Sequence, residues 1–224
     1  MLSAKTKQKV ICECNYNIVP DPSFDYRAGT YPSDWFVNYF SFLNDAPLQK
    51  NLGEAFYQAR FAYKLMKALH LTKAKYYGFV KFQILQYASI YEAILDYYLD
   101  KYYKDEIMTT YADVFYSPVQ AMSYKTTIKH DGEDVLLCVK RIRKKPIKLI
   151  KIQSRTEFAV SKGIISDSMR VRICNLYDTR NNVHILKATQ NKYVPKLIDA
   201  KEAFSLMVDF IGEIKAYLGT IAAE

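Results

Sequence analysis

Arg180 and His184 are the residues whose types and spacing best suit chemistry. They lie within residues 176–185, with three residues between them. Because four positions make about one helical turn, both side chains leave the same face of a helix. Ile173 and Leu176 precede them at helical spacing, so this face continues an apolar stripe. An always-charged guanidinium and an imidazole that exchanges protons near neutral pH are therefore directed toward an interior or an interface.

Such placement costs free energy unless the two groups are paired or functional. In the structural alternative, Arg180 binds a nearby carboxylate, and His184 lies near a helix end where it bonds backbone carbonyls. Glu92 is the candidate carboxylate, because it interrupts residues 76–99, which are apolar nearly all round. A carboxylate in that setting needs a cationic partner, and Arg180 is the candidate. In the functional alternative, the same residues take part in catalysis.

The composition indicates a folded globular protein with an excess of positive charge. Hydrophobic residues make up 50% of the chain and charged residues 25%, and 7 Gly and 7 Pro are few for an all-β fold. Lys and Arg number 32 against 23 Asp and Glu, which gives a net charge of +9. This excess favours an acidic partner such as nucleic acid or an anionic surface.

Three features argue against a membrane, secreted or metal-binding protein. The most apolar segment, residues 76–99, carries Lys81, Glu92 and Asp96, which is unfavourable in a membrane span. Residues 1–9 are polar and lack the features of a secretory signal. The cysteines do not have the spacing of a zinc site, so we expect reduced thiols in a cytoplasmic protein with no metal or cofactor. They are Cys12, Cys14, Cys138 and Cys174.

The hydrophobic periodicity predicts a mainly α fold in one domain, residues 33–224, after a partly irregular arm at residues 1–32. Within the arm, residues 9–19 are compatible with a short strand. Caps and turn residues divide the domain into helices. The longest begins at Thr72 or Lys73 and ends near Tyr103, Gly163 ends a later helix, and Ser166-Asp167 caps the next one. The segments expected to form a helical bundle are 74–103, 146–162, 168–185 and 194–218.

A β-hairpin is predicted as an insertion at about residues 124–140. Two β-branched or apolar runs flank Asp131-Gly132, which is a strong signal for a tight turn. Residues 107–118, before the hairpin, are expected to be irregular. The densest group of cations follows the hairpin and is either an RNA-binding surface or a solvated strand end and helix start. Its members are Arg141, Arg143, Lys144, Lys145, Lys148 and Lys151.

Four segments together resemble HEPN domains, the compact all-α modules of prokaryotic toxins, phage-defence proteins and RNA-processing nucleases. Residues 88–96, a small and aromatic run around an inward Glu92, resemble the family's long early helix. Residues 149–165 resemble the helix before the motif, 176–185 the motif itself, and 194–218 the closing helix. The resemblance implies a HEPN-like helical bundle with an inserted β-hairpin.

By this resemblance, Arg180, Asn181 and His184 would form a metal-independent ribonuclease site, assembled where two protomers of a homodimer meet. Arg180 would contact the scissile phosphate, and His184 would serve as general acid or base. Asn181 would position His184 or the RNA, and Glu92 would support Arg180. The expected setting is phage defence or a toxin–antitoxin system, with RNA and an antitoxin or defence protein as partners.

Two alternatives follow from the same residues. Three residues separate Arg180 from His184, whereas longer spacings are more usual in the family. The chain could therefore be a catalytically inactive HEPN-like module that binds RNA, nucleotide or a protein. In the second alternative, it is a helical dimerisation protein whose net charge is incidental.

Overall fold

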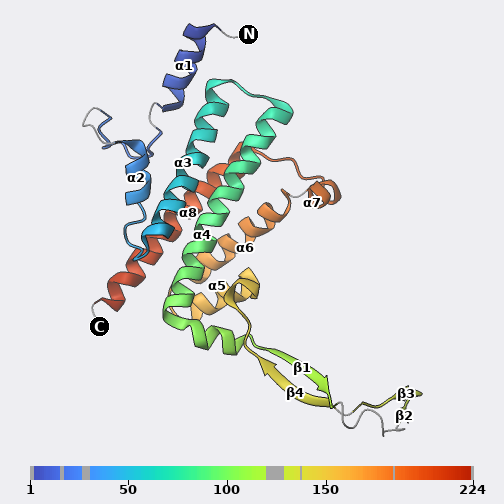
Figure 1. The fold of residues 1–224 in the computed structure, drawn as a ribbon. Coiled ribbons are helices and arrows are strands. Elements are labelled where there is room, and N and C mark those ends of the chain that lie inside the picture. Colours follow the sequence, from blue (N-terminus) through green and yellow to red (C-terminus); the bar gives the residue numbers. More distant parts are fainter. Residues whose placement is uncertain are drawn as a thin grey trace.

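Helices dominate the described part of the chain, and a thin β-ribbon projects from one end of the helical body (Figure 1). The computed structural model describes residues 3–15, 18–26, 31–119, 129–136, 138–183 and 185–222. The predicted mainly α fold with an inserted antiparallel hairpin is confirmed at this level.

Three long helices form the centre of the fold. α3 (Ala46–Ala68) packs against α4 (Lys73–Thr110), and α4 packs against α8 (Leu197–Ile221). Residues 83–99 of α4 are buried around most of the helix circumference, as suits a segment that is apolar nearly all round. Tyr103 has non-helical backbone angles and marks a kink, so the predicted end of this helix near Tyr103 coincides with a bend rather than a terminus.

The N-terminal arm differs from the prediction. Residues 9–19 do not form a strand, because α1 (Ala4–Asn15) is a helix that packs against α3. After it, Ile18 and Val19 are buried in the core, and the Ile18 carbonyl accepts a hydrogen bond of 3.0 Å from Arg60 Nε. The short α2 (Pro32–Asn38) then covers another side of α3. These contacts between distant segments stabilise the arm.

The segment predicted as one helix over residues 146–162 is divided. η1 (Ile147–Leu149) is a single 3₁₀ turn, and α5 (Ile152–Ser161) begins only after extended backbone at Ile150. Gly163 ends the segment as predicted, with a φ of 68° that glycine adopts at little cost.

The next helix, α6 (Asp167–Asn181), is shorter than the predicted 168–185. Its last turn tightens, since the Val183 N–H donates to the Arg180 carbonyl at 3.1 Å. A separate short helix, α7 (Ile185–Gln190), follows. Arg180 is therefore in the last turn of α6, and residue 184 comes after the end of that helix.

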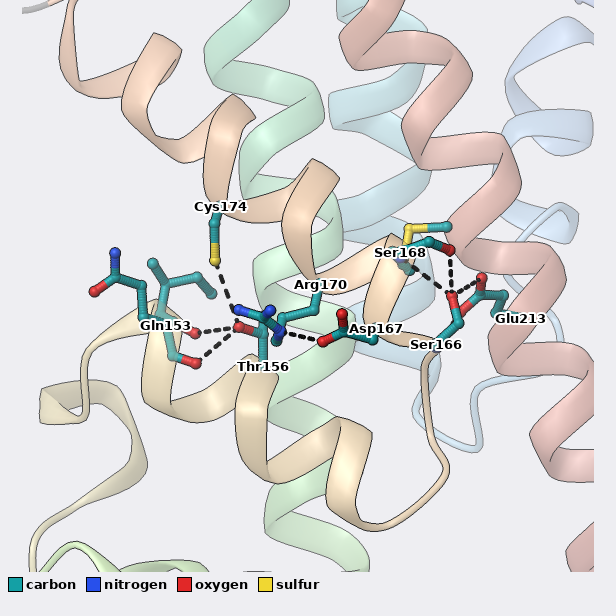
Figure 2. Close-up of polar contacts among 10 residues, drawn as sticks. Gln153, Thr156, Ser166, Asp167, Ser168, Arg170, Cys174 and Glu213 are labelled. Atoms are coloured by element: carbon teal, nitrogen blue, oxygen red, sulfur yellow. Dashed lines mark hydrogen bonds and ion pairs between the residues drawn. The ribbon is translucent and has the colours of Figure 1, made fainter.

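The start of α6 is fixed by Ser166, the predicted cap (Figure 2). Ser166 Oγ accepts a hydrogen bond of 3.1 Å from the Met169 N–H. The same hydroxyl donates to Glu213 Oε1 at 2.8 Å, and the Ser166 N–H donates to Glu213 Oε2 at 2.7 Å. Because Glu213 belongs to α8, these bonds attach the beginning of α6 to the central helices.

The β-ribbon is longer than predicted. β1 (Asp113–Pro118) pairs antiparallel with β4 (Cys138–Arg143), and β2 (Lys129–His130) pairs with β3 (Glu133–Asp134) nearer its tip. Positive φ values at Asp131 and Gly132 confirm the predicted tight turn. The prediction of irregular structure over 107–118 is wrong, because α4 continues to Thr110 and β1 follows it. Residues 124–128 of the predicted first strand lie outside the described residues.

Candidate functional site

Arg180 is held partly buried on the inner side of α6. Its side chain is 26% exposed, and its Nη2 lies 3.9 Å from Glu92 Oε2 on α4. The guanidinium carbon lies 4.9 Å from the centre of the Tyr177 ring, one turn earlier on α6. Arg180 Nε is buried and has no hydrogen-bond partner among the described residues. The guanidinium is thus oriented by a charge and a ring, while part of the side chain remains exposed to solvent.

Arg155 is the residue that binds Glu92 most closely, and sequence reasoning missed it. Arg155 lies on α5 with a side chain only 4% exposed. Its Nη2 donates to Glu92 Oε1 at 2.8 Å, and its Nη1 donates to Asp96 Oδ1. Burial lowers the pKa of Arg155, but the bonds and charges of Glu92 and Asp96 outweigh burial, so the pKa is raised and the group stays charged.

A signal for Arg155 exists in the sequence. Ile152, Arg155, Thr156 and Ala159 follow helical spacing, so Arg155 lies within a buried apolar stripe. Glu92 and Asp96 are likewise four residues apart on a helix that is otherwise apolar on that side. Two inward carboxylates require more positive charge than one arginine supplies.

The two arginines differ in how firmly they are bound. Arg155 is enclosed and makes hydrogen-bonded ion pairs to both carboxylates, whereas Arg180 is nearer the surface and too far from Glu92 for a hydrogen bond. Arg155 is therefore the main partner of Glu92 and Asp96, although its single charge does not neutralise both carboxylates. Arg180 keeps the capacity to bind another anion. Its charge also acts on Tyr91: burial raises the pKa of Tyr91 well above its usual value, and the nearby charge of Arg180 opposes this rise.

A cleft of about 270 Å³ lies between the beginning of α5 and the second half of α6. It brings together Asn181 of the motif and Lys151 of the basic cluster, two residues predicted separately from the sequence. Tyr177 lines the cleft and also packs against Arg180, so the ring connects the guanidinium with this space. The remaining lining residues are Ile152, Gln153, Cys174 and Asp178.

The electrostatics of this cleft favour an anion at one end. Lys151 precedes α5, whose first turn has no side-chain cap and no acidic residue. Uncapped backbone N–H groups and a helix dipole attract negative charge. Asp178, on α6, is the carboxylate among the lining residues. An anionic ligand is therefore expected nearer α5 than nearer Asp178.

The structure does not test the predicted geometry of the whole motif. His184 lies outside the described residues. Because α6 ends at Asn181, the prediction of one continuous helix over 168–185 is wrong. What the described residues bring together is Arg180, Glu92 and Tyr177, with Asn181 in the adjacent cleft.

The six predicted RNA-binding cations follow a path from the ribbon to the cleft. Arg141 and Arg143 belong to β4, Lys148 lies in η1, and Lys151 precedes α5. Lys144 pairs with Asp105 at 2.7 Å and Lys145 with Asp113 at 3.0 Å, so these two are partly neutralised. The others form no ion pair with a described residue.

No protein-family model, curated protein or solved structure matches this chain. Among the described residues, no cluster of three or more His, Cys, Asp and Glu side chains could hold a metal ion. Within the same part of the chain, no helix contains a stretch apolar enough to span a bilayer. None of the cysteines at 12, 14, 138 and 174 forms a disulfide with another described residue.

Proposed function

We propose that this chain is a HEPN-type, metal-independent endoribonuclease that acts as a homodimer. The observation that supports the proposal best is the state of Arg180. It is oriented by Glu92 and Tyr177, yet its side chain is 26% exposed and its Nη2 lies 3.9 Å from Glu92, which is too far for a hydrogen bond. A phosphate oxygen is the kind of acceptor that a guanidinium in this state can bind.

The proposed reaction uses the 2′-hydroxyl of the RNA as nucleophile. This oxygen attacks the adjacent phosphorus, the bond to the 5′-oxygen of the next nucleotide breaks, and a 2′,3′-cyclic phosphate and a 5′-hydroxyl result. Arg180 stabilises the extra negative charge on the phosphate oxygens. His184 transfers a proton as general base or general acid, and the motif of the partner protomer supplies the second proton-transfer group. Asn181 positions the RNA from the neighbouring cleft.

Arg155 has a positioning role in this scheme. By forming the hydrogen-bonded ion pairs to Glu92 and Asp96, it leaves Arg180 able to pair with the substrate instead of being fully bound to α4. Glu92 still fixes the direction of Arg180 from a distance of 3.9 Å. Preorganised charge of this kind needs little rearrangement during the reaction.

The test is cleavage of single-stranded RNA in the presence of a chelator. The wild-type protein should generate products with cyclic phosphate ends, and Arg180→Ala and His184→Ala should each abolish them. Arg172→Ala is a matched control, because Arg172 lies on the same helix and pairs with Asp209 of α8 instead. Cleavage that persists in both motif variants would mean that another site or a contaminant is responsible.

A second candidate function is RNA binding without catalysis. It is favoured by the end of α6 at Asn181 together with the short spacing of the motif, because this spacing brings the two motif side chains to one face only where a helix continues between them. This alternative predicts salt-sensitive RNA binding by wild-type protein and no cleavage of any RNA.

The proposed setting is a defence or toxin–antitoxin system in which a partner protein restrains the nuclease. Growth arrest on expression of the wild-type chain, and normal growth with Arg180→Ala at equal protein levels, would support it. Equal arrest by both would show that toxicity does not depend on the site. Sedimentation of the purified protein as a monomer at all concentrations would exclude the homodimer.

A further inference from the structure

The β-ribbon projects away from the helical body (Figure 1). Several of its large apolar side chains are exposed. Tyr116 is 65% exposed and Ile142 is 71% exposed, and Val114 and Phe115 are also exposed. A two-stranded ribbon has little core of its own and is marginally stable in water. Exposed rings and branched side chains on such an element mark a surface that binds a ligand or another macromolecule.

The strand register places each exposed ring beside a cation. Phe115 on β1 is directly opposite Arg141 on β4, and Tyr116 is directly opposite Lys140. Side chains of directly opposite residues share a face, and successive residues alternate between faces. Each face of the ribbon therefore presents one aromatic ring next to one positive charge.

Carboxylates near the base of the ribbon do not neutralise these cations. Asp113 pairs with Lys145, and Asp105 pairs with Lys144. Lys140, Arg141 and Arg143 form no ion pair with a described residue. Arg141 is instead oriented along the ribbon, because its Nε donates to Ser117 Oγ at 2.9 Å.

We propose that this ribbon is a binding site for single-stranded RNA, with bases stacked on Phe115 and Tyr116 and phosphates bound by Lys140, Arg141 and Arg143. Rings stack on any base, and cations attract any phosphate, so the site tolerates many sequences. The two rings lie on opposite faces of β1, whose second edge has no described strand beside it. A flexible single strand can cross this open edge and reach both faces, whereas a rigid duplex cannot.

The inference deepens the proposed ribonuclease function and rests on it for the identity of the ligand. It adds a surface that binds RNA on the ribbon, at the opposite end of the row of cations that leads to Lys151 and the cleft. It also assigns β1, a segment that its sequence did not mark as a strand, to substrate binding.

The experiment measures binding of a fluorescein-labelled oligoadenylate by fluorescence anisotropy at several salt concentrations. Phe115→Leu and Tyr116→Leu remove the rings but keep apolar side chains, and each should weaken binding by roughly 5- to 100-fold. Phe115→Trp keeps an aromatic ring at this position and should bind RNA at least as tightly as the wild-type protein does. Val114→Ala is the matched control, since Val114 is an exposed apolar residue of the same strand without a ring, and it should bind as wild type does.

The salt dependence separates stacking from charge. The leucine variants should keep the wild-type slope of log affinity against log salt, because they remove no charge. Arg141→Ala and Arg143→Ala should each reduce that slope by about 0.7. Unchanged affinity in both leucine variants would overturn the proposal. Weakened self-association in sedimentation with unchanged RNA affinity would also overturn it, because the ribbon would then contact a second copy of the chain.

The binding assay distinguishes this proposal from the ribonuclease proposal. Ring-dependent binding by a wild-type protein that cleaves no RNA would support the ribbon site and reject the nuclease. Cleavage that depends on Arg180, together with binding that is indifferent to the rings, would support the nuclease and reject the ribbon site.

Discussion

Replacing Arg155 by methionine should destabilise the protein strongly, although Arg155 has no direct contact with the proposed substrate. Methionine preserves much of the volume but leaves Glu92 and Asp96 without their main partner. Breaking a buried ion pair by removing one member costs about 3–5 kcal/mol. The two carboxylates keep 24% and 30% of their side-chain surface exposed, so water relieves part of the cost. We therefore expect about 3 kcal/mol, at the lower end of this range.

The assay is urea denaturation followed by far-ultraviolet circular dichroism, together with thermal melting. For a chain of this length, about 3 kcal/mol corresponds to a melting temperature lower by about 6–12 °C. Arg172→Met is the matched control, because Arg172 makes an exposed ion pair with Asp209 at 2.7 Å. It should change stability by less than about 1 kcal/mol.

A further variant tests the cause of the effect. Combining Arg155→Met with Glu92→Gln and Asp96→Asn removes all three charges and should recover part of the lost stability. The reasoning would be refuted if Arg155→Met and Arg172→Met were equally stable. It would also be refuted if Glu92→Gln and Asp96→Asn lowered the free energy of unfolding as much in the Arg155→Met variant as they do in the wild-type protein.

Substitutions in other elements of the fold should change the free energy of unfolding by smaller amounts, which the same denaturation assay measures. Ser166→Ala removes the cap of α6 and its bond to Glu213, and should cost about 1–2 kcal/mol in urea denaturation. Gly163→Ala should cost about 1–2 kcal/mol through its positive φ alone, because no atom lies within 4 Å of the added carbon. Replacing residues 113–143 with a short flexible linker should leave cooperative unfolding intact, because β1 and β4 pair with each other. Loss of cooperativity would show that the ribbon belongs to the core.

The sequence was most informative where local signals and burial agree. The long helices α3 and α8 have apolar stripes that match their buried faces, and α4, which is apolar nearly all round over residues 76–99, lies between them. The turn at Asp131-Gly132, the end at Gly163 and the cap at Ser166 depend on short-range chemistry, and all three were predicted. These features need no information about distant residues.

The sequence was least informative where a segment depends on a distant partner. β1 is exposed and becomes a strand only by pairing with β4. Arg155 bonds to Glu92, which lies 63 positions earlier in the chain. The prediction that Arg180 neutralises Glu92 was therefore incomplete, because the nearer cation could be identified only once α5 and α4 were placed side by side.

The most direct test of the central claim is the rate of RNA cleavage by Arg180→Ala, measured under single-turnover conditions with chelator, beside its stability in urea. Arg180 is 3.9 Å from Glu92 and partly exposed, so its removal should cost far less stability than removal of Arg155. We expect the cleavage rate to fall by at least about a hundredfold, because a donor to the reacting phosphate is lost. Wild-type protein that cleaves no RNA, or an Arg180→Ala variant that cleaves as fast as wild type, would contradict the assignment of this site.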